Sequence, residues 1–129
     1  MPVKYRLTKI NDNITGNTEP RFSVTLISNG NINLEQIARK ISQMSSFTSG
    51  DIIGTVEGLL HVMAEEMKAG NTVSITGLGT FYPTGELTRE VNDPGKVRSE
   101  SVRLKSIAFR PSPGLRKRMS NIEFVKTNR

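Results

Sequence analysis

The segment MKAGNTVSITGLGTF, residues 67–81, contains the change of pattern that decides the fold. An apolar helical stripe ends at Gly70, and Val73 and Ile75 then alternate with polar residues as in a half-buried strand. Gly77-Leu78-Gly79 interrupts this alternation, and an extended run resumes directly after it. The segment therefore predicts a helix followed by a β-hairpin.

The glycines of this segment have a second interpretation, as a phosphate-binding loop. Such loops follow a strand and open a helix, with more glycine or with a Lys-Ser/Thr pair. Here Tyr82 and Pro83 follow instead. This context favours a tight turn.

Two helices are predicted upstream of the hairpin. Asn33 with Gln36, and Thr48 with Asp51, have the spacing of capping boxes. Apolar residues then recur at helical spacing over about 34–44 and 49–69. The second stripe is wider than the short first helix can cover, so part of it must face strands or a second subunit. We expect Leu60 to lie in a helix-helix core.

Strands are predicted at both ends of the chain. Alternating residues indicate strands over 3–9 and 22–26, separated by a turn-rich segment, 11–20, that we expect to be mobile. Pro and Gly among charged residues predict a loop or protruding arm over 83–100, after which alternation returns. Ser112-Pro113 predicts the start of a short helix over about 113–120, followed by a terminal strand.

Length and composition exclude several classes of protein. The chain has 129 residues, enough for one ordinary domain, with no Cys and a single His. These counts exclude disulfides, thiolate catalysis, Cys-ligated zinc and a His-paired nucleophile. We therefore expect no catalytic site, no cofactor and no metal. The N-terminal residues lack the apolar stretch of a signal peptide, and no window is apolar enough for a spanning helix, which predicts a cytoplasmic location and no membrane partner.

The net charge of +6 lies entirely in the C-terminal part of the chain. Residues 1–81 carry 7 basic and 7 acidic side chains, whereas residues 82–129 carry 11 basic and 5 acidic ones. A one-sided basic field attracts polyanions because their condensed counterions are released on binding. Nucleic acid is the first candidate partner, ahead of an anionic membrane surface or a charge that serves only solubility.

The order of these elements resembles the HU and integration host factor family of bacterial DNA-binding proteins. The resemblance runs from about Leu34 to Ser120 and rests on MKAGNTVSITGLGTF, on AFRPSPGLRKRM at 108–119, and on the 26 residues between Phe81 and Ala108, a length similar to the family's arm. The terminal segments resemble an HU-related subgroup of Bacteroidetes. The resemblance implies an α+β fold in an intertwined homodimer, with a helical base, an antiparallel sheet and an arm.

This resemblance divides the chain into three parts. They are an N-terminal strand extension over 1–33, an HU-like DNA-binding domain over 34–120 with its arm at about 83–100, and a C-terminal strand and tail over 121–129. The resemblance and the charge together give the candidate DNA-binding residues Arg89, Pro94, Lys96, Arg98, Arg103, Lys105, Arg110, Arg116 and Lys117. Arg110 stands out because it precedes the start of a predicted helix, where free backbone N–H groups favour phosphate.

The predicted arm departs from the family in its charge. Asp93 stands beside Pro94 at the tip, and residues 83–100 hold 3 basic and 4 acidic side chains. Two functions remain open. The first is a non-enzymatic, largely sequence-nonspecific architectural DNA-binding protein of the nucleoid. It would bind duplex DNA as a homodimer through basic strand and arm residues, with bending of the DNA left open, and it would have no small-molecule substrate. The second is a dimeric structural or protein-interaction module with weak or lost DNA binding.

Overall fold

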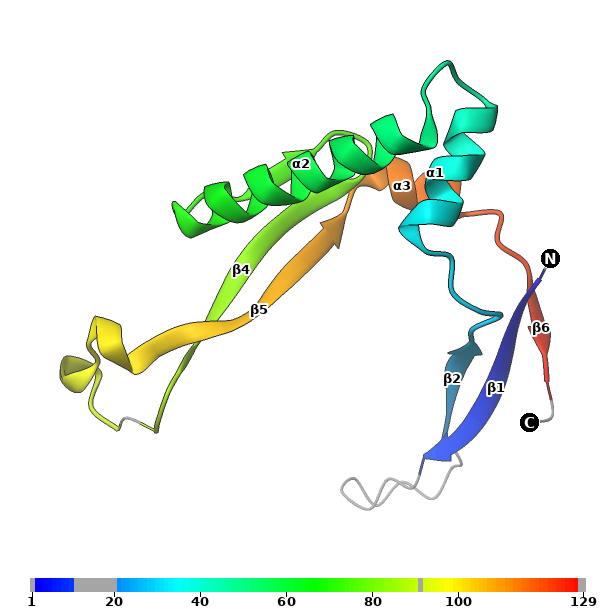
Figure 1. Ribbon diagram of the computed structural model, residues 1–129. Coiled ribbons are helices and arrows are strands. Elements are labelled where there is room, and N and C mark those ends of the chain that lie inside the picture. The colour runs from blue at the N-terminus through cyan, green and yellow to red at the C-terminus, as the bar shows by residue number, and fades with distance from the viewer. Residues whose placement is uncertain (1, 11–20, 91, 128–129) are drawn as a thin grey trace.

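The computed structural model describes residues 2–10, 21–90 and 92–127, and in this part the chain is of the α+β class (Figure 1). The segment 11–20, expected to be mobile, lies outside the described residues. The elements follow one another as β1 (Val3–Ile10), β2 (Arg21–Ile27), α1 (Leu34–Gln43), α2 (Ser49–Lys68), β3 (Val73–Ile75), β4 (Gly79–Leu87), β5 (Val102–Pro111), α3 (Pro113–Arg118) and β6 (Phe124–Lys126).

Both long helices begin at the predicted capping boxes. The Asn33 side chain accepts a hydrogen bond from the Gln36 N–H at 2.9 Å, and the Gln36 side chain accepts one from the Asn33 N–H at 3.0 Å. Thr48 and Asp51 make the same reciprocal pair, at 3.1 Å in each direction. The hydrogen bonds from Thr48 hold the pKa of the Asp51 carboxyl below its ordinary value, since they stabilise the carboxylate. The start of each helix was therefore correctly predicted from local sequence.

The predicted hairpin forms the first two strands of a three-stranded antiparallel sheet with the order β3-β4-β5, in which β4 is central. The turn is closed by a hydrogen bond of 2.9 Å from the Leu78 N–H to the Ile75 carbonyl, which confirms the turn interpretation of the glycines. Strands β4 and β5 pair from Gly79↔Pro111 to Leu87↔Val102, with a bulge at Thr84/Gly85. The base of the predicted arm is thus a paired ribbon rather than a loop.

The end of this ribbon is built from two 3₁₀ turns, Pro94–Lys96 and Ser99–Ser101. The Thr88 N–H donates to the Ser101 carbonyl at 2.8 Å and joins the two sides of the arm beyond the last strand pair. Ser101 is buried, with 7% of its surface exposed. Figure 1 shows the arm projecting away from α2 and from the rest of the chain.

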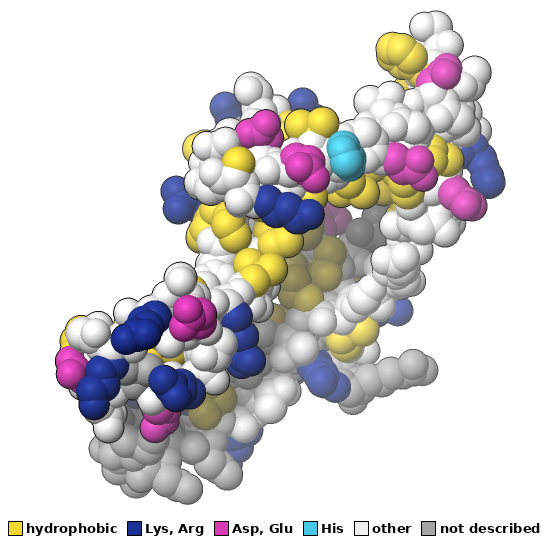
Figure 2. Space-filling view, turned by 60° about the vertical axis from the view of Figure 1, so that its left-hand side comes forward, with side chains coloured by type: hydrophobic (Ala, Val, Ile, Leu, Met, Phe, Trp, Pro, Cys, Tyr) yellow, Lys and Arg dark blue, Asp and Glu magenta, His cyan; other side chains and the backbone are white. Residues whose placement is uncertain are grey.

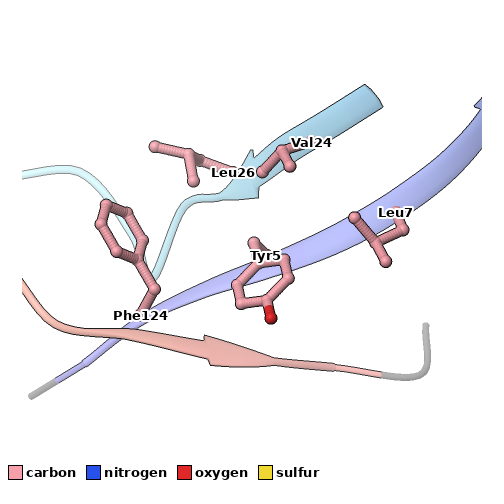
Figure 3. Close-up of a pocket in the computed structure, with 5 residues that line it drawn as sticks. All are labelled: Tyr5, Leu7, Val24, Leu26 and Phe124. Carbon is pink, nitrogen blue, oxygen red and sulfur yellow. The ribbon is translucent and has the colours of Figure 1, made fainter. Parts of the chain in front are cut away.

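A second sheet joins the two ends of the chain. Its order is β2-β1-β6, with β1 and β2 antiparallel and β1 and β6 parallel. One face is apolar and forms an open groove of about 490 Å³ lined by Tyr5, Leu7, Val24, Leu26 and Phe124 (Figure 3). We call this the terminal sheet. The division of the chain at residues 33 and 120 stays a prediction, to which the structure adds that both end segments share one sheet.

The core within a single chain is small. Among the described residues, only Ala38 of α1 and Met63 of α2 are buried hydrophobic side chains, at 0% and 8% exposure. Leu60 is 59% exposed, so its own chain does not cover it, and the prediction that Leu60 lies in a helix-helix core is wrong for the single chain. The apolar stripe of α2 is broader than the surface with which α1 and the sheet cover it. The sequence had predicted this, because the stripe is too wide for the short first helix to cover.

Candidate nucleic-acid interface

The β3-β4-β5 sheet has one apolar and one polar face. The apolar face packs toward α2: Pro83, Leu104 and Ile107 line a groove together with Ala64 and Met67 of that helix. On the same face the rings of Phe81 and Phe109 lie 4.7 Å apart. The opposite face carries the cross-strand pairs Thr80↔Arg110, Tyr82↔Ala108, Thr84↔Ser106 and Glu86↔Arg103. We call this second surface the polar sheet face.

Arg110 lies on the polar sheet face and stacks on an aromatic ring. Its guanidinium carbon is 5.6 Å from the centroid of the Tyr82 ring. A guanidinium held over a ring keeps the N–H donors of its planar edge available, and those donors match the geometry of phosphate oxygens. Arg110 is therefore both positioned and able to bind an anion.

Arg103 also lies on this face, but its charge is paired within the chain. Its Nε donates to Glu86 Oε1 at 2.9 Å, between side chains that are 60% and 37% exposed. An exposed pair of this kind contributes little to stability, about 0 to 1 kcal/mol. Its effect here is electrostatic, because the Glu86 carboxylate offsets the positive charge of Arg103.

Lys105 occupies the bulge between the two registers of the ribbon. Thr84 pairs with Ser106 and Gly85 with Leu104, which leaves Lys105 as the extra residue of β5. Leu104 is three residues from Ile107, so strict alternation would put Leu104 on the polar face. The bulge shifts the register by one residue and places Leu104 on the apolar face with Ile107. That i, i+3 spacing of apolar residues, opposite Gly85, is the sequence signal that reveals the bulge.

The helix after β5 gives Arg110 little support. Helix α3 has only six residues, its first residue is Pro113, which has no N–H, and the Leu115 N–H donates to Ser112 Oγ at 3.0 Å. The expected phosphate site at this helix start is therefore largely filled by the chain itself. Arg116 and Lys117 are exposed in the last turn of α3, where their charge complements the helix dipole.

The remaining predicted residues gather at the end of the arm. Arg89 and Lys96 line a polar depression there together with Glu90, Asn92 and Asp93. Figure 2 shows basic and acidic side chains intermixed on this part of the surface. Asp93 Oδ1 accepts a hydrogen bond of 3.0 Å from the Gly95 N–H and so fixes the turn that Pro94 opens. The backbone carbonyl of Arg98 accepts from the Ser101 N–H at 2.9 Å in the second turn.

The candidate residues thus form three groups: the end of the arm, the polar sheet face and the exposed side of α3. No group of three His, Cys, Asp or Glu side chains that could hold a metal occurs among the residues described. In the same part of the chain, none of the helices has the length and apolar character needed to cross a membrane.

Two solved structures resemble this fold. A crystal structure from Bacteroides vulgatus ATCC 8482, described as a putative bacterial DNA binding protein, matches with a TM-score of 0.67 and 17% identity over 98% of this chain and 49% of its own. The chain therefore spans about half the length of that relative. The Anabaena HU–DNA cocrystal structure matches with a TM-score of 0.52 and 17% identity, over 70% of this chain and 99% of its own.

These structural matches show a shared fold, and a comparison of sequences leads to the family. No curated protein sequence matches this chain. A family model does match it over residues 1–126, a span that includes the arm, the central sheet and both strands of the N-terminal segment. The chain belongs to the HU-HIG family, described as an HU domain fused to wHTH, Ig, or glycine-rich motif.

Proposed function

We propose that this chain is a non-enzymatic, largely sequence-nonspecific architectural DNA-binding protein of the nucleoid, acting as an intertwined homodimer. The observation that carries the proposal is the polar sheet face. There Arg110, held over Tyr82, lies on the strand opposite Thr80, whose hydroxyl is paired with that of Ser74 at 3.0 Å, and the arm projects from the same two strands. Arg side chains are typical donors to DNA phosphates.

The HU-type domain and the net charge support the same partner. The chain belongs to an HU family, and one of its structural relatives was solved with DNA. The whole excess of +6 lies in residues 82–129, which include β5, the arm and α3. Phosphate contacts fix the position of a protein on the duplex without reading its sequence, so we infer weak sequence preference.

The exposed surface of the chain supports the homodimer. Its accessible surface is 11083 Å², against about 6,800 Å² for a typical folded monomer of this mass. Part of the excess comes from the arm and the terminal sheet. The rest includes α2, where Leu60 and Val62 are more than half exposed although they lie on different sides of the helix. Obligate dimer interfaces cover surfaces of this kind.

The test of DNA binding is a salt titration with a short duplex. We expect log Kd to depend steeply and linearly on log salt concentration. Lys105→Ala/Arg110→Ala should lower the slope by about 2 if each residue contacts one phosphate. Arg39→Ala/Lys40→Ala on α1 removes the same charge from the helical layer and serves as the control. Equal losses of slope in both variants would contradict a contact surface on β5.

The Arg103–Glu86 pair leads to a second prediction, in which a substitution strengthens DNA binding instead of weakening it. Glu86→Gln should strengthen DNA binding and raise the salt slope by about 1, because Arg103 becomes available to a phosphate. The double variant Glu86→Gln/Arg103→Gln is the control, since it removes both charges and should lose the gain. Unchanged binding in Glu86→Gln would show that Arg103 stays away from the DNA.

The arm tip is predicted to bend DNA only modestly. Inserting Pro94 between base pairs costs a few kcal/mol of unstacking, and the mixed charge around it supplies few contacts to offset this. Asp93→Asn should strengthen binding, because the amide keeps the acceptor for Gly95 and removes the carboxylate charge. Energy transfer across an end-labelled duplex measures the bend, with Pro94→Ala expected to change it little. Complete loss of bending in Pro94→Ala, with no gain in Asp93→Asn, would identify an intercalating arm.

The second candidate function is a dimeric structural or protein-interaction module with weak DNA binding. The ion pair that neutralises Arg103 and the acidic side chains around the arm tip favour it. Under this alternative, duplex binding disappears at moderate salt while the dimer remains intact. The salt titration therefore separates the two functions.

A further inference from the structure

The terminal sheet carries charge of one sign only. Its three strands contain Lys4, Arg6, Lys9, Arg21 and Lys126 and no Asp or Glu. This is unlike the arm, where both signs are mixed. A small sheet with five cations is suited to a polyanionic partner.

The two faces of this sheet differ in chemistry. Lys4 and Arg6 alternate with the apolar residues Val3, Tyr5 and Leu7 of β1, so they lie on the face opposite the apolar groove. Thr25 of β2 pairs with Arg6, and Ser23 pairs with Thr8. The resulting surface, which we call the hydroxyl-basic face, contains Lys4, Arg6, Thr8, Ser23 and Thr25, with Ile27 and Val125 as the apolar neighbours of Lys4.

The cations of this face keep their charge available. In the described part of the chain, neither Lys4 nor Arg6 has an acidic partner, and both side chains are exposed. Two residues apart on a strand, their attachment points lie about 7 Å from each other on one side. Lys, Arg, Ser and Thr together are the side chains that commonly bind the DNA sugar-phosphate backbone.

The terminal sheet also projects in a suitable direction. In Figure 1 the arm and the terminal sheet extend from the same side of the helices α1, α2 and α3. A duplex bound to the polar sheet face on this side of the molecule would run near both projections. The apolar face of the terminal sheet is the one suited to protein packing, which leaves the hydroxyl-basic face for a polar ligand.

We propose that the hydroxyl-basic face of the terminal sheet is a second contact surface for the backbone of duplex DNA. The proposal rests on the DNA binding proposed above and extends the bound site beyond the central sheet and the arm. A second copy of the chain is a poorer partner for this face, because it would bring like charges together.

Lys4→Gln/Arg6→Gln tests the proposal in the same salt titration, on a duplex long enough to span the arm and the terminal sheet. We expect the log-log slope to fall by about 2. The matched control is Lys9→Gln/Lys126→Gln, which removes the same charge from the same sheet. Because Lys9 pairs with Phe22 and Lys126 with Tyr5, both control residues lie on the apolar side. The control variant should keep the wild-type slope.

Several results would overturn the proposal. Equal slopes for the two variants would mean that the sheet acts only through its net charge or not at all. A change in sedimentation caused by Lys4→Gln/Arg6→Gln would identify a subunit interface instead. Lys105→Ala/Arg110→Ala, measured in parallel, shows whether only the second contact surface is wrong or whether the proposed DNA binding is wrong as well. If it lowers the slope while Lys4→Gln/Arg6→Gln does not, only this extension fails, whereas wild-type protein without salt-dependent binding would refute the proposed function as well.

Discussion

Leu60→Asp is expected to abolish the folded homodimer. Leu60 is 59% exposed in the single chain, so in a monomer the carboxylate would remain largely in solvent. In the proposed dimer the partner chain covers Leu60, and an unpaired charge buried there costs about 3 to 5 kcal/mol. The variant should sediment as a monomer or as unfolded chain and lose most of its cooperative melting by circular dichroism.

His61→Asp is the matched control for this experiment. It adds the same carboxylate at the neighbouring position of α2, and His61 is exposed. Wild type and His61→Asp should both sediment as dimers, with melting temperatures that rise with protein concentration. If Leu60→Asp melts and sediments like wild type, Leu60 stays in solvent in the assembled protein and the proposed dimer interface is wrong.

Gly79→Ala is expected to produce the second large loss, through the central sheet. Gly79 has a φ of +151°, and a Cβ there would overlap the carbonyl oxygen of Arg110 and come within 2.6 Å of Phe109 Cε2. The backbone strain and the displaced strand should together cost about 2 to 5 kcal/mol. Denaturant unfolding measures the loss, and DNA binding should weaken in parallel because Arg110 moves with β5.

Gly77→Ala, in the same turn, separates strain from overlap. Gly77 has a φ of +85°, but a methyl group added there would meet no atom within 4 Å, so only the cost of the left-handed conformation applies, about 1 to 2 kcal/mol. Gly79→Ala should therefore be clearly the more destabilising of the two. Similar losses in both variants would show that the contact between Gly79 and β5 is not required.

The sequence alone determined the local elements of this protein. Capping boxes at Asn33 and Thr48 placed the helix starts because their hydrogen bonds join residues only three positions apart. Alternation predicted the strands and the glycines predicted the turn for the same reason, since each pattern reports on the backbone of its own segment. The family resemblance, based on the hairpin, the length of the arm and the segment 108–119 that contains α3, was confirmed by the match over residues 1–126.

Only the tertiary structure decided how distant segments meet. The Glu86–Arg103 pair joins residues 17 positions apart and depends on a register that the bulge at Thr84/Gly85 sets. The parallel pairing of β6 with β1 unites the two ends of the chain, which alternation within either strand cannot specify. Leu60 shows the same limit. An apolar stripe indicates that one face of a helix must be covered, but the packing of α1 and the sheet against α2 determines which residues of that stripe the chain itself covers.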